Sequence, residues 1–347
     1  MTGARDIRAV APNLKRRLSG VTATIERLVP LMPGVVATGP GLPASVPHIT
    51  LMQAALMKRD RWRVWHARRN TEMLLGLALR YVLRRKYRLL FTSASQRAHT
   101  GYTKWLISRM EAVIATSQKT ANYLDREARV ILHGIDTARF SPTDTKASAK
   151  AALGLPEGDI FIGCIGRIRH QKGTDVFVDA MIAACKADRR VRGTIIGRAT
   201  EQHVDFQKGL EQKIRNAGLH HRIRFVAEVP VDEIVDWYRA LDLFVAPQRW
   251  EGFGLTPLEA MACGVPVIAT RVGAFEELVV DHETGRLIPA SDVDAMIAAI
   301  AETLSDEATL PKWSDAARKH TEANFRIEGE ADKILSVYEE LLEGRAS

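Results

Sequence analysis

Two carboxylates, Glu251 and Glu259, stand eight positions apart across a glycine-containing turn. The segment Glu251-Gly-Phe-Gly-Leu-Thr-Pro-Leu-Glu259 follows an apolar run and leads into a predicted helix. Backbone N–H groups at a strand–turn–helix junction favour a phosphate, and Gly252 and Gly254 permit close approach to the backbone. The carboxylates could hydrogen-bond two groups of hydroxyls on one ligand. We therefore predict a site for a phosphorylated, hydroxyl-bearing ligand; the alternative is a capped helix with two solvated glutamates.

A second cluster of polar residues follows the apolar run 160–165. It reads Gly166-Arg167-Ile-Arg-His-Gln-Lys172-Gly173. Arg167 suits a forked contact with phosphate oxygens, and Lys172 supplies a point charge. No Asp-x-Asp motif that could hold a divalent metal lies nearby. Fixed cations would then have to neutralise a leaving diphosphate; the alternative is a basic surface loop.

Both clusters need strand ends to position them. Continuous apolar runs alternate with helical patterns, which predicts parallel sheets covered by helices on both faces. The predicted strands are 8–12, 63–67, 88–92, 112–116 and 129–133, then 160–165, 191–197, 223–226, 243–247 and 266–270. Predicted helices include 19–30, 71–86 and an amphipathic last helix at about 327–343.

Polar residues and a proline at 140–145 interrupt this pattern. We predict an α/β chain with two doubly wound, Rossmann-like domains, at residues 1–142 and 143–325. The helix in 326–347 can pack back toward the first domain. If the domains face each other, a deep cleft forms at the carboxyl ends of their strands, where ligands bind in open α/β sheets.

The net charge of +8 hides an asymmetry between the two halves. Residues 1–140 contain 24 Lys+Arg against 8 Asp+Glu, a net of +16, and the remainder contains 25 against 33, a net of −8. The first half should therefore attract anions such as nucleic acid, anionic lipid or a phosphorylated acceptor; the alternative is a solvated basic surface. The segment 74–87 resembles a basic amphipathic helix that could rest on an anionic membrane, and a core helix with a solvated basic face is the other interpretation.

Three scattered cysteines, Cys164, Cys185 and Cys263, lie in apolar stretches. They favour buried free thiols and a reducing compartment. The first residues show no apolar leader, and the apolar runs are shorter than a spanning helix needs. We expect a soluble, cytoplasmic protein.

The combined motifs resemble the retaining glycosyltransferases of family four, whose GT-B architecture has two facing Rossmann-like domains. The matching stretches are Gly-Arg-x4-Lys-Gly at 166–173, Glu-x7-Glu at 251–259, Pro-Val-Ile-Ala-Thr-Arg-Val-Gly at 266–273 and His-Gly-Ile-Asp-x3-Phe-x-Pro at 133–142. The resemblance covers most of the chain. It implies sugar transfer from a nucleotide sugar, with retention and without a metal or other cofactor.

The resemblance also assigns roles to residues. Arg167 and Lys172 would bind the donor diphosphate and, with Glu251, form the catalytic group. Glu251 would contact donor-sugar hydroxyls and Glu259 the ribose. The remaining donor-binding candidates are Gly20, Gly252, Phe253, Gly254, Leu255 and Thr256.

A closer resemblance is to lipopolysaccharide core mannosyltransferases of alpha-proteobacteria, carried by the stretches 11–24, 66–73 and 91–101. It implies GDP-mannose as donor and a Kdo sugar on lipid A as acceptor. It also implies a peripheral location on the cytoplasmic face of an anionic membrane.

The first domain departs from the wider family pattern in two places. Ser19-Gly20 stands where many members have paired glycines, and Phe91-Thr-Ser lacks the histidine of a Phe-His-x motif. His66 or His99 could occupy part of that space, although a lone histidine is more often structural. The candidates for binding an anionic acceptor are Lys15, Arg16, Arg17, Ser19, His66, Arg68, Arg69, Arg97 and His99.

Two other functions are weighed against this one. The first is hexosyl transfer with another donor, such as UDP-glucose, or to another glycan. The second is a non-enzymatic nucleic-acid-binding protein, but no helix-turn-helix, zinc-finger or aromatic RNP pattern is present. We expect no nucleic-acid partner.

Overall fold

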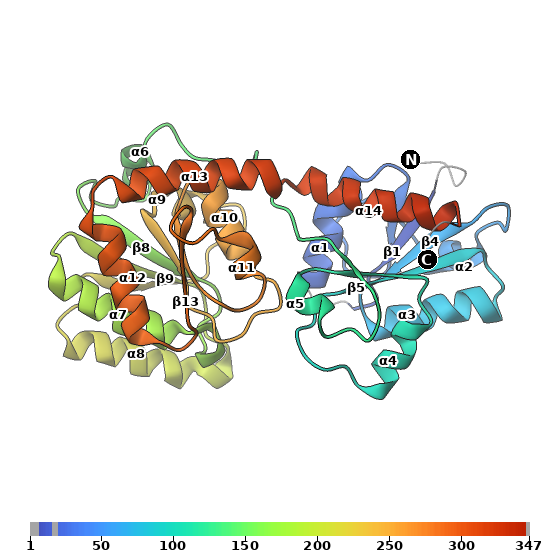
Figure 1. Ribbon diagram of the computed structural model, residues 1–347, viewed down its shortest axis with the longest axis horizontal. Coiled ribbons are helices and arrows are strands. Elements are labelled where there is room, and N and C mark those ends of the chain that lie inside the picture. The colour runs from blue at the N-terminus through green and yellow to red at the C-terminus, as the bar shows by residue number, and fades with distance from the viewer. Residues whose placement is uncertain (1–6, 16–19, 345–347) are drawn as a thin grey trace. The chain divides into compact units, whose positions relative to one another are not determined.

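The computed structural model describes residues 7–15 and 20–344. Its contacts divide the chain into two compact units. Unit 1 combines Met1–His133 with Ile327–Ser347, and unit 2 is Gly134–Arg326. Figure 1 shows that each unit consists of a sheet flanked by helices. All strand pairs between the named strands of the described chain are parallel, which confirms the predicted α/β class.

The described part of unit 1 contains a seven-stranded sheet in the order β3-β2-β1-β4-β5-β6-β7. Its central strands are short, buried apolar runs, as expected for strands covered on both faces. The strands are β1 (Ala9–Pro12), β2 (Val35–Thr38), β3 (His48–Ile49), β4 (Arg63–Ala67), β5 (Tyr87–Ser93), β6 (Ala112–Ala115) and β7 (Arg129–Val130).

Helices cover both faces of this sheet. One core joins it to α1 (Gly20–Leu28) and α14 (Ile327–Leu342), and the other joins it to α2 (Leu51–Leu56), α3 (Asn70–Leu77) and α4 (Gly101–Ser108). In Figure 1, α14 and α3 lie on opposite sides of the unit 1 strands. The last helix of the chain is therefore part of the first unit's core. Short segments η1 (Val29–Leu31), η2 (Ala78–Val82) and α5 (Gln118–Ala121) complete the unit.

The described part of unit 2 contains a six-stranded sheet in the order β10-β9-β8-β11-β12-β13. Its strands are β8 (Ile160–Ile165), β9 (Val191–Ile196), β10 (Ile223–Val226), β11 (Leu243–Ala246), β12 (Val267–Thr270) and β13 (Gly285–Ile288). The helices are α6 (Lys146–Ala152), η3 (His170–Lys172), α7 (Thr174–Ala187), η4 (Glu201–His203), α8 (Val204–Asn216), α9 (Ile234–Ala240), α10 (Thr256–Ala262), α11 (Phe275–Leu278), α12 (Val293–Ser305) and α13 (Thr309–Asn324).

The boundary between the units falls at residue 133, whereas the sequence predicts it at 142. Residues 134–142 are held by the end of unit 2. The amide of Ile135 donates to the Phe325 carbonyl at 2.7 Å, and Arg318 donates to the carbonyls of Phe140 and Thr137 at 2.8 and 3.2 Å. These bonds assign the segment to unit 2 although its composition resembles a linker.

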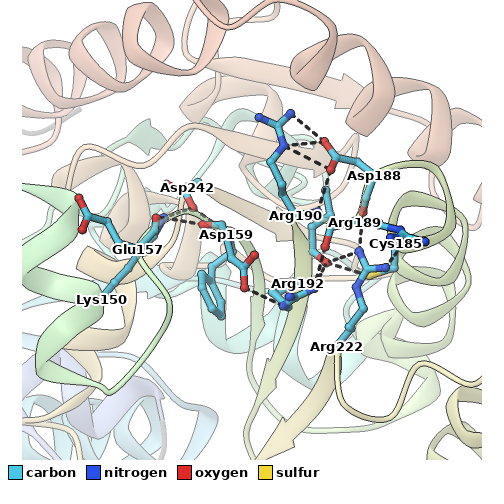
Figure 2. A network of polar contacts seen from close by, with 12 residues as sticks. Lys150, Glu157, Asp159, Cys185, Asp188, Arg189, Arg190, Arg192, Arg222 and Asp242 are labelled. Atoms are coloured by element: carbon cyan, nitrogen blue, oxygen red, sulfur yellow. Dashed lines mark hydrogen bonds and ion pairs between the residues drawn. The ribbon is translucent and has the colours of Figure 1, made fainter.

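Ionic groups at the amino ends of β8, β9 and β11 are paired with one another (Figure 2). Lys150 contacts the Asp242 carboxylate at 2.9 Å and donates to the Asp159 carbonyl at 2.7 Å. Arg192 pairs with the Asp159 carboxylate at 2.9 Å, and Arg222 donates to the Cys185 carbonyl at 2.7 Å. The charged side chains at the amino ends of these strands therefore bond to neighbouring residues of unit 2.

The cysteines and the lengths of the helices were also considered in the sequence predictions. All three cysteines are buried free thiols, as predicted, and burial raises the pKa of Cys164 to about 12. None of the helices in the described residues has the length and apolar character needed to cross a bilayer.

Candidate functional site

The two predicted clusters meet at the carboxyl ends of adjacent strands. The segment 166–173 follows β8 and the segment 247–255 follows β11, and these strands pair with each other. Strand order reverses between them, because β8 continues toward β9 on one side and β11 toward β12 on the other. Such a switch point is where open α/β sheets bind ligands.

The structure brings Lys172 and Glu251 into direct contact. The Lys172 ammonium and the Glu251 carboxylate form an ion pair, and both side chains are about four-fifths buried. The second Glu251 oxygen accepts a hydrogen bond from the Gly252 amide at 3.0 Å. A partly buried cation and anion thereby compensate each other while both stay close to the strand ends.

Unpaired backbone amides follow Glu251 in the same turn. The amides of Gly254, Leu255 and Thr256 donate no hydrogen bond to any other described residue. Gly254 has φ +88°, and a Cβ added there would lie 2.3 Å from the Phe275 ring and 3.0 Å from Glu251 Cγ. Glycine at this position therefore allows the turn to pass close to Glu251. The unpaired N–H groups of the turn are suited to binding an anion.

Glu259 is fixed by a residue that sequence reasoning did not select. The Tyr238 hydroxyl donates to Glu259 Oε2 at 2.6 Å from a fully buried ring on α9. Burial raises the pKa of Tyr238 well above its usual value, and the neighbouring carboxylate adds to the effect. The phenol consequently remains a donor that orients the Glu259 carboxylate.

A bidentate ion pair joins the two clusters. Arg249 Nη1 and Nη2 lie 2.7 and 2.8 Å from the two carboxylate oxygens of Asp175. The Arg249 amide also donates to the Gln171 carbonyl at 2.9 Å, and its guanidinium donates to the His170 carbonyl at 2.6 Å. These bonds fix the position of the Lys172 turn relative to the Glu251 turn.

Arg167 differs from Lys172 in its surroundings. Its side chain is exposed, and no hydrogen bond or ion pair engages it within the part of the chain that the structure describes. The guanidinium is therefore available to an anionic ligand at the same strand edge.

The first-domain histidine His66 lies inside the core of unit 1. It is fully buried on β4, with Nδ1 2.7 Å from the Tyr338 hydroxyl and Nε2 2.6 Å from Thr92 Oγ1. Thr92 occupies the position where the family pattern has its histidine. Burial holds the pKa of His66 well below its usual value, and the nearby Arg68 adds to this. Both ring nitrogens are thus occupied, and the imidazole is neutral.

Arg68 and Arg69 also make contacts within unit 1. Both follow β4, and both bond to the fully buried Glu72. One Glu72 oxygen accepts from the Arg68 amide at 2.8 Å, and the other pairs with Arg69 Nη1 at 2.7 Å. Arg69 also donates to Asn13 Oδ1 at 2.9 Å. Of these two cations, Arg69 is therefore neutralised by an ion pair within unit 1.

The remaining acceptor candidates of the first domain, and the donor candidate Gly20, have more open surroundings. Lys15 and Arg97 are exposed, and Gly20 begins α1 as an exposed residue. His99 is half-buried; its Nε2 atom has no hydrogen-bond partner in the described structure, and burial lowers the pKa of its ring. Arg16, Arg17 and Ser19 lie outside the described residues.

The buried state of His66 predicts a pH dependence of stability. Above pH ~6.5 its imidazole is neutral in both the folded and the unfolded chain. As the pH falls below that value, the unfolded chain takes up a proton that folded His66 does not, so the free energy of unfolding decreases. We expect denaturant titrations between pH 7.5 and 5 to show a decrease for the wild type that exceeds the decrease for His66→Gln by up to ~1.4 kcal/mol per pH unit.

His221 provides the matched control, because its side chain is exposed. The variant His221→Gln should retain the wild-type slope. Equal slopes for the wild type and His66→Gln would show that His66 takes up its proton as readily in the folded chain.

The family described as glycosyl transferases group 1 matches residues 145–320. This match covers half of the chain and lies entirely within unit 2. It includes both clusters of the site.

Two named proteins also match the chain over almost their whole length. The chain is 53% identical to the lipopolysaccharide core biosynthesis mannosyltransferase LpsB of Rhizobium meliloti, over 99% of this chain and 100% of that protein. It is 48% identical to the lipopolysaccharide core biosynthesis mannosyltransferase LpcC of Rhizobium leguminosarum, over 99% of each chain.

Solved structures share the fold. HepE from Anabaena, in complex with UDP, has a TM-score of 0.84 at 19% identity, covering 95% of this chain and 99% of that one. A glycosyltransferase from Rickettsia africae has a TM-score of 0.82 at 19% identity, covering 97% and 99%. These similarities confirm the predicted GT-B fold class.

The motifs at both strand ends, the match over 145–320 and the full-length relatives lead to one assignment. The chain belongs to the glycosyl transferases group 1 family and is a glycosyltransferase.

Proposed function

We propose that this enzyme transfers mannose, with retention, from GDP-mannose to the Kdo of the lipopolysaccharide inner core. The observation that carries the chemistry is the Lys172–Glu251 pair beside three unpaired backbone amides. The choice of sugar and pathway is supported by the names of the two relatives that match over their full length. The acceptor would be a lipid A–Kdo glycolipid at the inner face of the cytoplasmic membrane.

In the proposed reaction, the bond between the sugar C1 and the donor phosphate oxygen breaks, and a bond from C1 to the acceptor oxygen forms. Negative charge grows on the leaving diphosphate. Arg167, Lys172 and the unpaired amides of the turn would stabilise it, because preorganised donors act strongly in a partly dehydrated site. The acceptor hydroxyl attacks from the face that the phosphate leaves, and its proton passes to a leaving phosphate oxygen.

The carboxylates have different tasks in this scheme. Glu251 would accept hydrogen bonds from sugar hydroxyls, and Glu259, held by Tyr238, would accept them from the ribose. We propose that the fixed cations suffice without a metal ion. Among the described residues, no group of three or more His, Cys, Asp or Glu side chains is arranged to hold a metal.

A transfer assay with several donors tests the proposal. The purified enzyme is incubated with Kdo–lipid A and either GDP-mannose or UDP-glucose, and mass spectrometry detects the addition of one hexose. We expect transfer from GDP-mannose alone, unchanged by a chelator, and a product whose anomeric configuration, determined by NMR, matches that of the donor.

Lipid A without Kdo is the control acceptor and should receive no sugar. Transfer from UDP-glucose in preference to GDP-mannose would support the alternative hexosyl donor. An inverted anomeric centre would contradict the retaining mechanism while leaving the choice of donor intact.

A further inference from the structure

Exposed apolar side chains gather at the amino ends of β4 and β5 in unit 1. They belong to segments 56–62 and 80–86, which precede these strands. Val82 is 75% exposed and Tyr81 is 61% exposed. The exposed apolar members are Leu56, Trp62, Tyr81, Val82 and Leu83. We call the two segments together the basic–apolar surface.

The two segments form one continuous surface. Arg59 Nη2 donates to the Leu83 carbonyl at 2.9 Å, and Arg85 Nη1 donates to the Met57 carbonyl at 3.2 Å. The guanidinium of Arg80 lies 5.5 Å from the Trp62 ring centroid. Hydrogen bonds and a cation–π contact therefore hold apolar and cationic side chains side by side.

The charge of this surface is strongly positive. The two segments contain one acidic residue, Asp60, whose carboxylate lies 3.1 Å from Arg63 Nη2. Their seven cations are Lys58, Arg59, Arg61, Arg80, Arg84, Arg85 and Lys86. In the described structure Lys58, Arg84 and Lys86 have no ion-pair partner. Arg80, in contrast, is paired with Glu111.

The local backbone explains why the apolar residues are exposed. The sequence predicts one helix over 71–86, but α3 ends at Leu77 and the π-helical turn η2 ends at Val82. The chain then turns through Arg84, which has φ +50°, before β5 begins at Tyr87. Val82 and Leu83 consequently stand at a turn next to three consecutive cations and away from the cores of the unit.

We propose that the basic–apolar surface docks on an anionic membrane. Cations beside exposed apolar side chains match a bilayer surface, where phosphates attract the charge and the acyl boundary accepts the apolar groups. A nucleic acid would use the cations but would leave Val82 and Leu83 without an apolar environment. The proposed function places the enzyme at the cytoplasmic membrane, and this inference identifies the surface that contacts it. It rests on the proposed function only for the choice of membrane.

Vesicle sedimentation tests the proposal with the full chain. Vesicles of phosphatidylcholine alone are compared with vesicles that also contain phosphatidylglycerol, at low salt. We expect the wild type to bind the anionic vesicles at least about tenfold more strongly, and higher salt to weaken the binding. Val82→Glu, and separately the double variant Arg84→Glu with Lys86→Glu, should each reduce binding by about tenfold or more.

Unit 2 offers matched controls. Val231 is 72% exposed, so Val231→Glu adds the same charge at an equally exposed valine. Lys208 and Arg215 are exposed on α8, so reversing both charges matches the double variant. Both controls should bind anionic vesicles within about twofold of the wild type, a difference well below the charge effects expected at the proposed surface.

Sugar transfer to a lipid-free Kdo oligosaccharide separates this inference from the proposed function. Val82→Glu should keep wild-type transfer to that acceptor while losing vesicle binding. Undiminished binding by both surface variants would overturn the docking surface, as would binding to duplex DNA without binding to vesicles. Failure of every variant and the wild type to transfer mannose would instead count against the proposed function.

Discussion

Replacement of Lys172 by alanine is expected to lower kcat for sugar transfer by about a hundredfold to a thousandfold. This is the range observed when one preorganised donor is removed from a charge-stabilising site. Lys172 is about four-fifths buried beside Glu251, so its loss also leaves a partly buried carboxylate uncompensated near the diphosphate. Both consequences raise the energy of the charged transition state.

The effect is measured as initial rates at saturating donor, with circular dichroism to verify folding. Arg167→Ala should also reduce the rate, because the guanidinium is exposed at the same strand edge. Lys208→Ala removes an exposed lysine from α8 and should leave the rate unchanged. A near-normal rate for both Lys172→Ala and Arg167→Ala would refute their assignment to the diphosphate.

The sequence predicted both strands that position the site to within one residue of their observed bounds. The continuous apolar run of β8 predicted its bounds to the residue, because a strand buried on both faces contains no solvent-facing positions. The strands β2, β3 and β13 were not predicted. β3 has two residues, and Arg286 interrupts the apolar pattern of β13. A two-residue segment such as β3 carries no periodic pattern of its own, and it becomes a strand because it pairs with β2.

Within the candidate site, features encoded in one local segment could be predicted from the sequence, and contacts between distant segments could not. The turns that contain Lys172 and Glu251 were recognisable, because each is encoded within one local segment. Tyr238 lies 21 residues before Glu259, and Asp175 lies 74 residues before Arg249. Pairs formed across the fold in this way depend on strand order and helix packing, which local spacing does not contain.

Composition alone does not show which cations in the first half of the chain are paired in the fold. Arg69 is neutralised by Glu72, and the separation of only three residues between them was a detectable signal in the sequence. Arg80 is neutralised by Glu111, which lies 31 residues away and gave no such signal. The net charge therefore overstates the positive charge that unit 1 presents to a partner. The unpaired cations Arg84 and Lys86 lie before β5, at its amino end.

The substitution Gly173→Ala is expected to destabilise the chain by roughly 2–5 kcal/mol. Gly173 has φ +68°, a left-handed conformation that costs other residues roughly 1–2 kcal/mol. An added Cβ would also lie 1.8 Å from the Pro247 carbonyl oxygen, a backbone atom at the end of β11. Relieving that overlap by backbone displacement adds about 1–3 kcal/mol.

Alanine substitutions at two other glycines distinguish the cost of the backbone conformation from the cost of the overlap. Both are measured by chemical denaturation. Gly154 has φ +64° with open space around it, so Gly154→Ala should show the conformational cost alone. Gly209 lies within α8 with open space and no positive φ, so Gly209→Ala should be neutral or stabilise the chain by up to ~1 kcal/mol. A decrease in the free energy of unfolding for Gly173→Ala no larger than that for Gly154→Ala would mean that the turn containing Gly173 moves freely relative to β11. In that case it does not hold Lys172 against Glu251, and donor binding by Gly173→Ala should equal that of Gly154→Ala.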